Sequence, residues 1–105
     1  MRVFKCNSCT KIHVEAGNIL IDFVNEEQLI KYLRELDGID VEYYAALNAG
    51  KPLSKSIFLP VSGVNVKLGF TVDEFEVFKN VIRSYLSASY KTINLICDKN
   101  SICLN

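Results

Sequence analysis

The sequence has little of the material from which common catalytic sites are built. Its 105 residues include one histidine, five glycines and two prolines. It contains no nucleophile elbow, no phosphate-cradling glycine loop and no His-x-x-His-type metal pair, each of which requires set residues at set spacings. These absences disfavour an enzyme. An enzyme using a Cys6/Cys9 dithiol or a carboxylate cleft is the alternative that stays open.

Neither sign of charge is in excess. Lysine and arginine together number 12, aspartate and glutamate also number 12, and the sequence pI is about 6.6. Attraction to a phosphate backbone needs a surplus of basic residues on one face. The charge balance therefore argues against nucleic acid as a partner.

Long apolar runs are also missing. The first nine residues form no signal-peptide core, and no stretch approaches the roughly 20 apolar residues of a membrane span. We therefore expect a cytoplasmic protein without membrane contact. Cytoplasmic thiols are kept reduced, so the four cysteines suggest free thiols, a metal site or redox chemistry before disulfides.

The length and composition are typical of one globular domain over residues 1–105. Half of the residues are hydrophobic and 23% are charged. A chain of this length buries roughly two-thirds of its unfolded surface, so folding requires no metal, cofactor or disulfide.

Residues 56–70 alternate with period two on both sides of Ser62-Gly63, which predicts a β-hairpin with a two-residue turn. Pro60 cannot donate to a ladder, so its strand should lie at a sheet edge. Thr71 and Glu74 then form a capping box, and apolar residues at three- and four-residue spacing predict a helix to about Ala88.

A similar unit comes earlier in the chain. Residues 11–15 and 18–24 predict a first hairpin, and Asn25 caps a helix that Gly38 ends. The chain thus consists of two ββα units in tandem. We predict an α+β, two-layer fold in which a mainly antiparallel sheet of four or five strands carries two principal helices on one face.

Two segments lie outside these units. Residues 40–48 favour a short helix with Asp40 as its cap, although strand residues are also present. The tail, residues 90–105, is expected to form an extra strand pair, or a dimer arm if it pairs with another chain.

Cys6-Asn7-Ser8-Cys9, followed by His13, is the one constellation that suggests chemistry. Two thiolates separated by two residues bind zinc through a tight turn, and His13 would be a third ligand. The fourth ligand would come from Cys97 or Cys103. Without a helix N-terminus after it, the motif gives little support to thiol activation. The remaining interpretation is four semi-buried cysteines with no joint task.

Three apolar residues are expected on the sheet face opposite the helices. Leu20, Val24 and Phe58 would form an exposed patch there, and such patches often mark a partner surface.

A set of short motifs resembles an uncharacterised family of small bacterial proteins, a domain of unknown function. These motifs are Cys6-x-x-Cys9-x-x-x-His13, Gly17-Asn18 before a strand and a capped helix, Ile57-x-Leu59-Pro60, and Thr71-x-x-Glu74-Phe75. The resemblance covers residues 6–86 and implies a bacterial, cytoplasmic, one-domain protein. It supplies no activity.

Together these features predict a small binding or interaction domain, with Cys6, Cys9 and His13 as a zinc-stabilised N-terminal knuckle. Zinc is the only cofactor that these residues suggest, and folding does not require it. The partner would be another protein or a second copy of the chain, and a structural homodimer is the further alternative.

Overall fold

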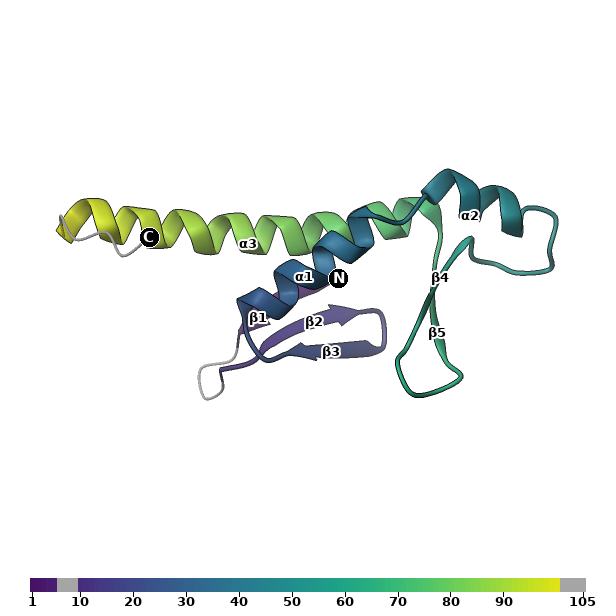
Figure 1. The fold of residues 1–105 in the computed structure, drawn as a ribbon, viewed down its shortest axis with the longest axis horizontal. Coiled ribbons are helices and arrows are strands. Elements are labelled where there is room, and N and C mark those ends of the chain that lie inside the picture. The colour runs from purple at the N-terminus through teal and green to yellow at the C-terminus, as the bar shows by residue number, and fades with distance from the viewer. Residues whose placement is uncertain (6–9, 101–105) are drawn as a thin grey trace.

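The computed structural model describes residues 1–5 and 10–100, with side chains as far as Ala88. It contains three helices and two antiparallel sheets, which confirms the α+β class (Figure 1). The elements in chain order are β1 (Arg2–Lys5), β2 (Ile12–Ala16), β3 (Ile19–Phe23), α1 (Glu26–Asp37), α2 (Val41–Asn48), β4 (Ile57–Pro60), β5 (Lys67–Phe70) and α3 (Val72–Asn100).

The first sheet has the order β1-β2-β3 and is antiparallel throughout. Val14 pairs with Val3 on one side and with Ile21 on the other, so these three side chains share the inner face. Gly17 has φ +62°, which suits the turn between β2 and β3. The sequence did not predict β1, a four-residue strand that is stabilised by its pairing with β2.

The second sheet is the β4–β5 hairpin. Its register pairs Leu59 with Leu68, and the Val61 amide donates to the Val66 carbonyl at 2.9 Å. The residues between that closing pair are 62–65, so the two-residue turn expected at Ser62-Gly63 is wrong. The alternating pattern continued through the turn, and alternation alone does not show where pairing stops.

Side-chain caps start all three helices. Asn25 Oδ1 accepts the Gln28 amide at 3.0 Å, and Asp40 Oδ1 accepts the Tyr43 amide at 3.0 Å. Thr71 Oγ1 accepts the Glu74 amide at 3.1 Å, while Glu74 Oε1 accepts the Thr71 amide at 2.8 Å. The predicted starts of α1 and α3 and the helix favoured after Asp40 are therefore confirmed.

Helix α3 is longer than expected. It runs to Asn100 instead of ending near Ala88, so residues 90–100 are helical where a strand pair was expected. After Thr71 the chain contains no glycine or proline that would end a helix. The part of the tail from residue 101 lies outside the described residues.

The core joins the two sheets through the helices. Rings from four elements form a chain of contacts: Phe23 with Tyr32 at 5.2 Å between centroids, Tyr32 with Phe78 at 6.2 Å, and Phe78 with Phe70 at 4.9 Å. The buried apolar residues of the described chain are Ile12, Val14, Phe23, Leu29, Leu36, Ile57, Leu59, Phe70, Phe75, Phe78 and Ile82.

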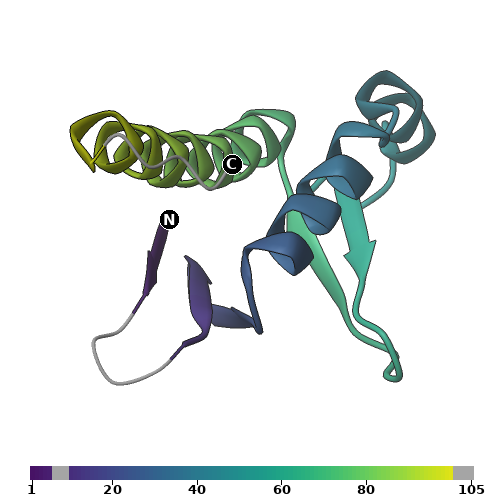
Figure 2. The same cartoon turned by 60° about the vertical axis from the view of Figure 1, so that its left-hand side comes forward.

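The five strands therefore contribute to one core but form two sheets, whereas the sequence predicted a single sheet. The first sheet and the β4–β5 hairpin are separate, and α3 contacts a strand of each (Figure 2). Hydrophobic alternation reports which face of a strand is buried, but it does not report the neighbouring strand. Here the turn between β2 and β3, rather than a strand edge, points toward the hairpin (Figure 1).

The molecule is elongated. Its radius of gyration is 16.5 Å and its principal extents are 58 × 27 × 20 Å. A compact domain of this length has a radius of about 13 Å. The difference arises because α3 extends well past both sheets (Figure 1).

Candidate binding cleft

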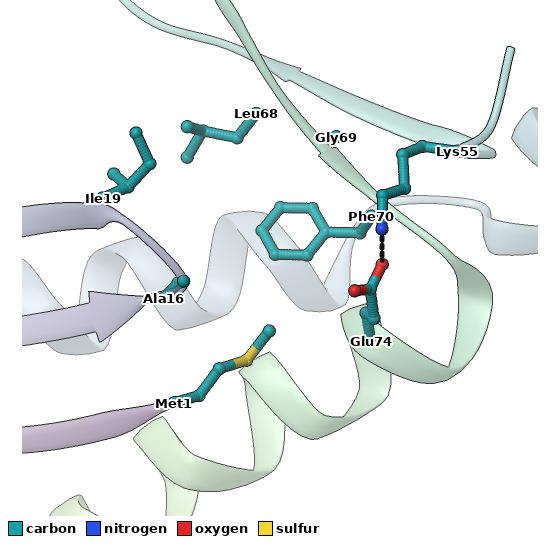
Figure 3. Close-up of a pocket in the computed structure, with 9 residues that line it drawn as sticks. Met1, Ala16, Ile19, Lys55, Leu68, Gly69, Phe70 and Glu74 are labelled. Atoms are coloured by element: carbon teal, nitrogen blue, oxygen red, sulfur yellow. Dashed lines mark hydrogen bonds and ion pairs between the residues drawn. The ribbon is translucent and has the colours of Figure 1, made fainter.

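An open cavity lies where the two sheets approach each other. Its volume is about 230 Å³. Nine residues line it, and Figure 3 shows them around a shared space: Met1, Ala16, Gly17, Ile19, Lys55, Leu68, Gly69, Phe70 and Glu74. We call this space the intersheet cleft. Most of its wall is aliphatic or aromatic, so it favours an apolar group over a polar one.

The walls of the cleft follow directly from the fold. On one side, Ala16 and Ile19 flank the turn that Gly17 allows, and they share the inner face of the first sheet. On the other side, β5 presents Leu68 and Phe70. Ile19 remains 38% exposed although it faces inward, because the hairpin does not close over it.

A charge pair lies at one end of the cleft. Lys55 Nζ donates to Glu74 Oε1 at 2.6 Å, and the Thr71 amide donates to the same oxygen. The Lys55 hydrogen bond, followed by that of the Thr71 amide, lowers the pKa of the Glu74 carboxyl from its ordinary value of 4.5. Glu74 is therefore ionised at neutral pH, and Figure 3 shows the pair beside Phe70.

Gly69 makes room for this pair. A Cβ on Gly69 would lie 3.1 Å from Lys55 Cγ and 3.1 Å from Phe58 Cε1. The absence of a side chain thus lets Lys55 pass over β5 and reach α3. The sequence contained a signal for this position, since Gly69 interrupts a strand of alternating larger residues, and such a glycine marks close approach of other groups.

The outer face of the first sheet carries a row of ring and carboxylate groups. His13 Nδ1 lies 2.6 Å from Asp22 Oδ1, and the Phe4 and His13 rings are 5.2 Å apart. In the same face, Arg2 lies 4.4 Å from the centre of the Phe4 ring and bonds Glu15 at 2.9 Å. The imidazole is thereby held in one orientation, with only 14% of its side chain exposed.

The structure describes one of the five metal-ligand candidates fully. His13 lies on β2. Cys6, Cys9 and Cys103 lie outside the described residues. Cys97 is part of α3, but the structure describes only its backbone. Over the described residues, no three side chains of His, Cys, Asp or Glu form a group that could hold a metal ion.

The three interaction candidates do not form one surface on one sheet. Leu20 and Val24 are 54% and 57% exposed and belong to the region of β3, whereas Phe58 is half-buried in β4. The expected patch required a single sheet, so the separation of the sheets removes its basis. Sequence reasoning also missed Met1, Ala16, Lys55 and Leu68 as lining residues, because tertiary proximity alone groups them.

The acidic residues near the end of α1 have structural partners. Arg83 Nη2 donates to both oxygens of Asp37, at 2.8 and 3.0 Å, and Lys79 Nζ lies 3.8 Å from the same carboxylate. Asp40 caps α2. These contacts link α1 to α3 and account for the local crowding of carboxylates.

Fold and cleft together define a small α+β protein with two open sheets over one core and an apolar cleft between them. The chain belongs to a family of unknown function, DUF6686, whose model matches residues 2–105. This match confirms the expected membership in an uncharacterised family. No curated protein and no solved structure matches the chain. No helix in the described chain is long and apolar enough to cross a membrane.

Proposed function

We propose that the protein is a binding domain that holds an apolar side chain of a protein partner in the intersheet cleft. The proposal rests on the open cavity of about 230 Å³ between Ile19 and Leu68. Small-molecule sites are commonly about 300–1,000 Å³, whereas a cavity of about 150 Å³ already accepts benzene. The size thus suits a single side chain better than a whole cofactor.

The chemistry of the cleft supports the same proposal. Among the described residues, Glu74 is the only carboxylate that lines the cleft. Its carboxylate already accepts hydrogen bonds from Lys55 and from the Thr71 amide. A bound group would gain free energy mainly by leaving water, at about 25 cal/mol per Å² of apolar surface. Partner recognition therefore fits this wall better than acid–base catalysis.

Selection from a displayed library of random heptapeptides tests the proposal. We expect enriched peptides to bind the purified protein, measured by fluorescence anisotropy, and Ile19→Glu to weaken that binding at least tenfold. Val77→Glu is the matched control, because Val77 is a half-exposed aliphatic residue on α3 outside the cleft. Peptides that bind all three proteins equally, or no enrichment, would overturn the proposal.

We propose zinc binding by Cys6, Cys9 and His13 as a second function of the same domain. Support comes from the pairing of Lys5 with Ile12, because the residues on either side of the cysteine-containing segment are neighbours and His13 follows Ile12 directly. Further support comes from the bond between His13 Nδ1 and Asp22, because zinc-bound histidines usually give their other ring N–H to a carboxylate. Cys97 or Cys103 would complete four ligands.

Elemental analysis of protein purified without added metal tests this second proposal. We expect about one zinc per chain, and Asp22→Asn should lower zinc affinity by about 10- to 100-fold, as is usual for loss of such a partner. Asp73→Asn, at the exposed start of α3, is the control substitution. Zinc far below one equivalent in the native protein would reject the proposal.

A further inference from the structure

We propose, resting on the function above, that the partner segment is an extended peptide that pairs with the open edge of β5 as an added strand. The peptide would alternate apolar residues with acidic ones. Backbone pairing of this kind supplies affinity, and pockets for alternate side chains supply specificity.

The residues of β5 that line the cleft show which side of the strand faces it. Leu68, Gly69 and Phe70 are consecutive, and all three line the cleft. Successive residues of a strand point to opposite faces, so three in a row border the same space only along the edge of the strand. The other edge of β5 pairs with β4, so the cleft lies along the unpaired edge.

The alternation of hydrogen-bonded and non-hydrogen-bonded pairs in the hairpin shows which main-chain amides and carbonyls point to that edge. The Val61 amide donates to the Val66 carbonyl, which makes this a hydrogen-bonded pair. Antiparallel pairs alternate in type, so Leu68 bonds toward β4, whereas the amides and carbonyls of Lys67 and Gly69 point away from it. Among the described residues, no turn, loop or cap hydrogen bond uses either main chain.

The two edges of the hairpin differ in their capacity to pair. By the same alternation, the nitrogen of Pro60 faces the outer edge of β4, and proline has no N–H to donate. The β4 edge is therefore interrupted. The β5 edge retains the amides of Lys67 and Gly69 as donors.

The side chains around the edge define the sequence that it would accept. Inner-face positions of an added strand would enter the apolar space between Ile19 and Leu68. Outer-face positions would lie near Lys67 and Lys55. Both lysines lie on the face of the hairpin toward which a Cβ on Gly69 would point. Glu74 offsets only one of these two positive charges. Charge complementarity thus favours acidic residues at the alternate positions.

A blocked heptapeptide with the order Thr-Glu-Leu-Glu-Val-Glu-Thr is the direct probe, and the same peptide with lysine for each glutamate is its control. We expect binding of the acidic peptide only, with the Lys67 and Gly69 amides becoming at least tenfold slower in hydrogen exchange by NMR. The Leu68 amide, which bonds toward β4, should change little. Lys67→Glu should weaken binding about tenfold, whereas Lys31→Glu, exposed on α1, should not.

The other possible results distinguish failure of strand addition from failure of the cleft proposal. If the peptide shifts the Ile19 and Leu68 methyl signals while the Lys67 and Gly69 amides stay unprotected, strand addition is wrong and the cleft proposal stands. If the peptide does not bind, strand addition is wrong, and the library selection alone decides on the cleft. Equal binding of the lysine peptide overturns the acidic preference.

Discussion

Phe78 has no exposed surface and touches rings from two other elements, Tyr32 on α1 and Phe70 on β5. Phe78 therefore connects α1 and α3 to the second sheet. Phe78→Ala should lower the free energy of unfolding by about 3–5 kcal/mol, because it removes a buried ring and leaves a cavity. Urea denaturation measures the loss.

Val77, its neighbour on α3, is 50% exposed and provides the control. Val77→Ala should change the free energy of unfolding by no more than about 0.5 kcal/mol. Similar losses for the two variants would contradict the assignment of Phe78 to the core.

Glu74 links pH to stability at the residue scale. Its pKa is lowered in the folded state, so its contribution is present above the unfolded pKa and is lost as the pH falls toward the folded pKa. Stability should therefore decrease as the pH falls below about 4.5, and Glu74→Gln should show a smaller decrease. Urea midpoints at pH 7 and pH 3 give the comparison, and identical pH dependence would contradict the prediction.

At the scale of elements, each helix depends on a short polar signal at its start. Asn25 precedes α1 and bonds the Gln28 amide, while Gln28 Oε1 accepts the Val24 amide at 3.0 Å. Asn25→Ala should cost about 1 kcal/mol, which corresponds to a decrease in Tm of roughly 4–8 °C for a domain of this size. Calorimetry measures the shift.

Asn25→Asp keeps an acceptor oxygen at the cap and should restore most of the lost stability. If Asp and Ala variants lose equally, the bond to Gln28 is not what stabilises the start of α1.

At the scale of the whole molecule, helix α3 extends past the part of the chain that carries the core. Every buried apolar residue of the described chain lies between Ile12 and Ile82. With both forms free of metal, a variant that ends at Tyr90 should therefore unfold cooperatively with nearly unchanged stability. Light scattering of both forms tests the hypothesis of a tail-mediated homodimer, since an unchanged monomer mass would reject it.

The sequence by itself determined the local elements of this protein. Capping pairs such as Thr71 with Glu74 are complete within four residues, and the alternation around Ile57 and Leu68 needs no distant partner to be recognised. The helix after Asp40 was favoured for the same reason. The length of α3 was misjudged because the tail carries apolar residues that suit either a strand or a helix.

Only the tertiary structure decided how the strands are grouped and where the cleft lies. Ile19 and Leu68 are far apart in the chain, and they line the same cleft because the aromatic contacts through Tyr32 and Phe78 hold the hairpin beside the turn at Gly17. Local patterns record the burial of a side chain, whereas the choice among possible neighbours depends on the packing of the whole core.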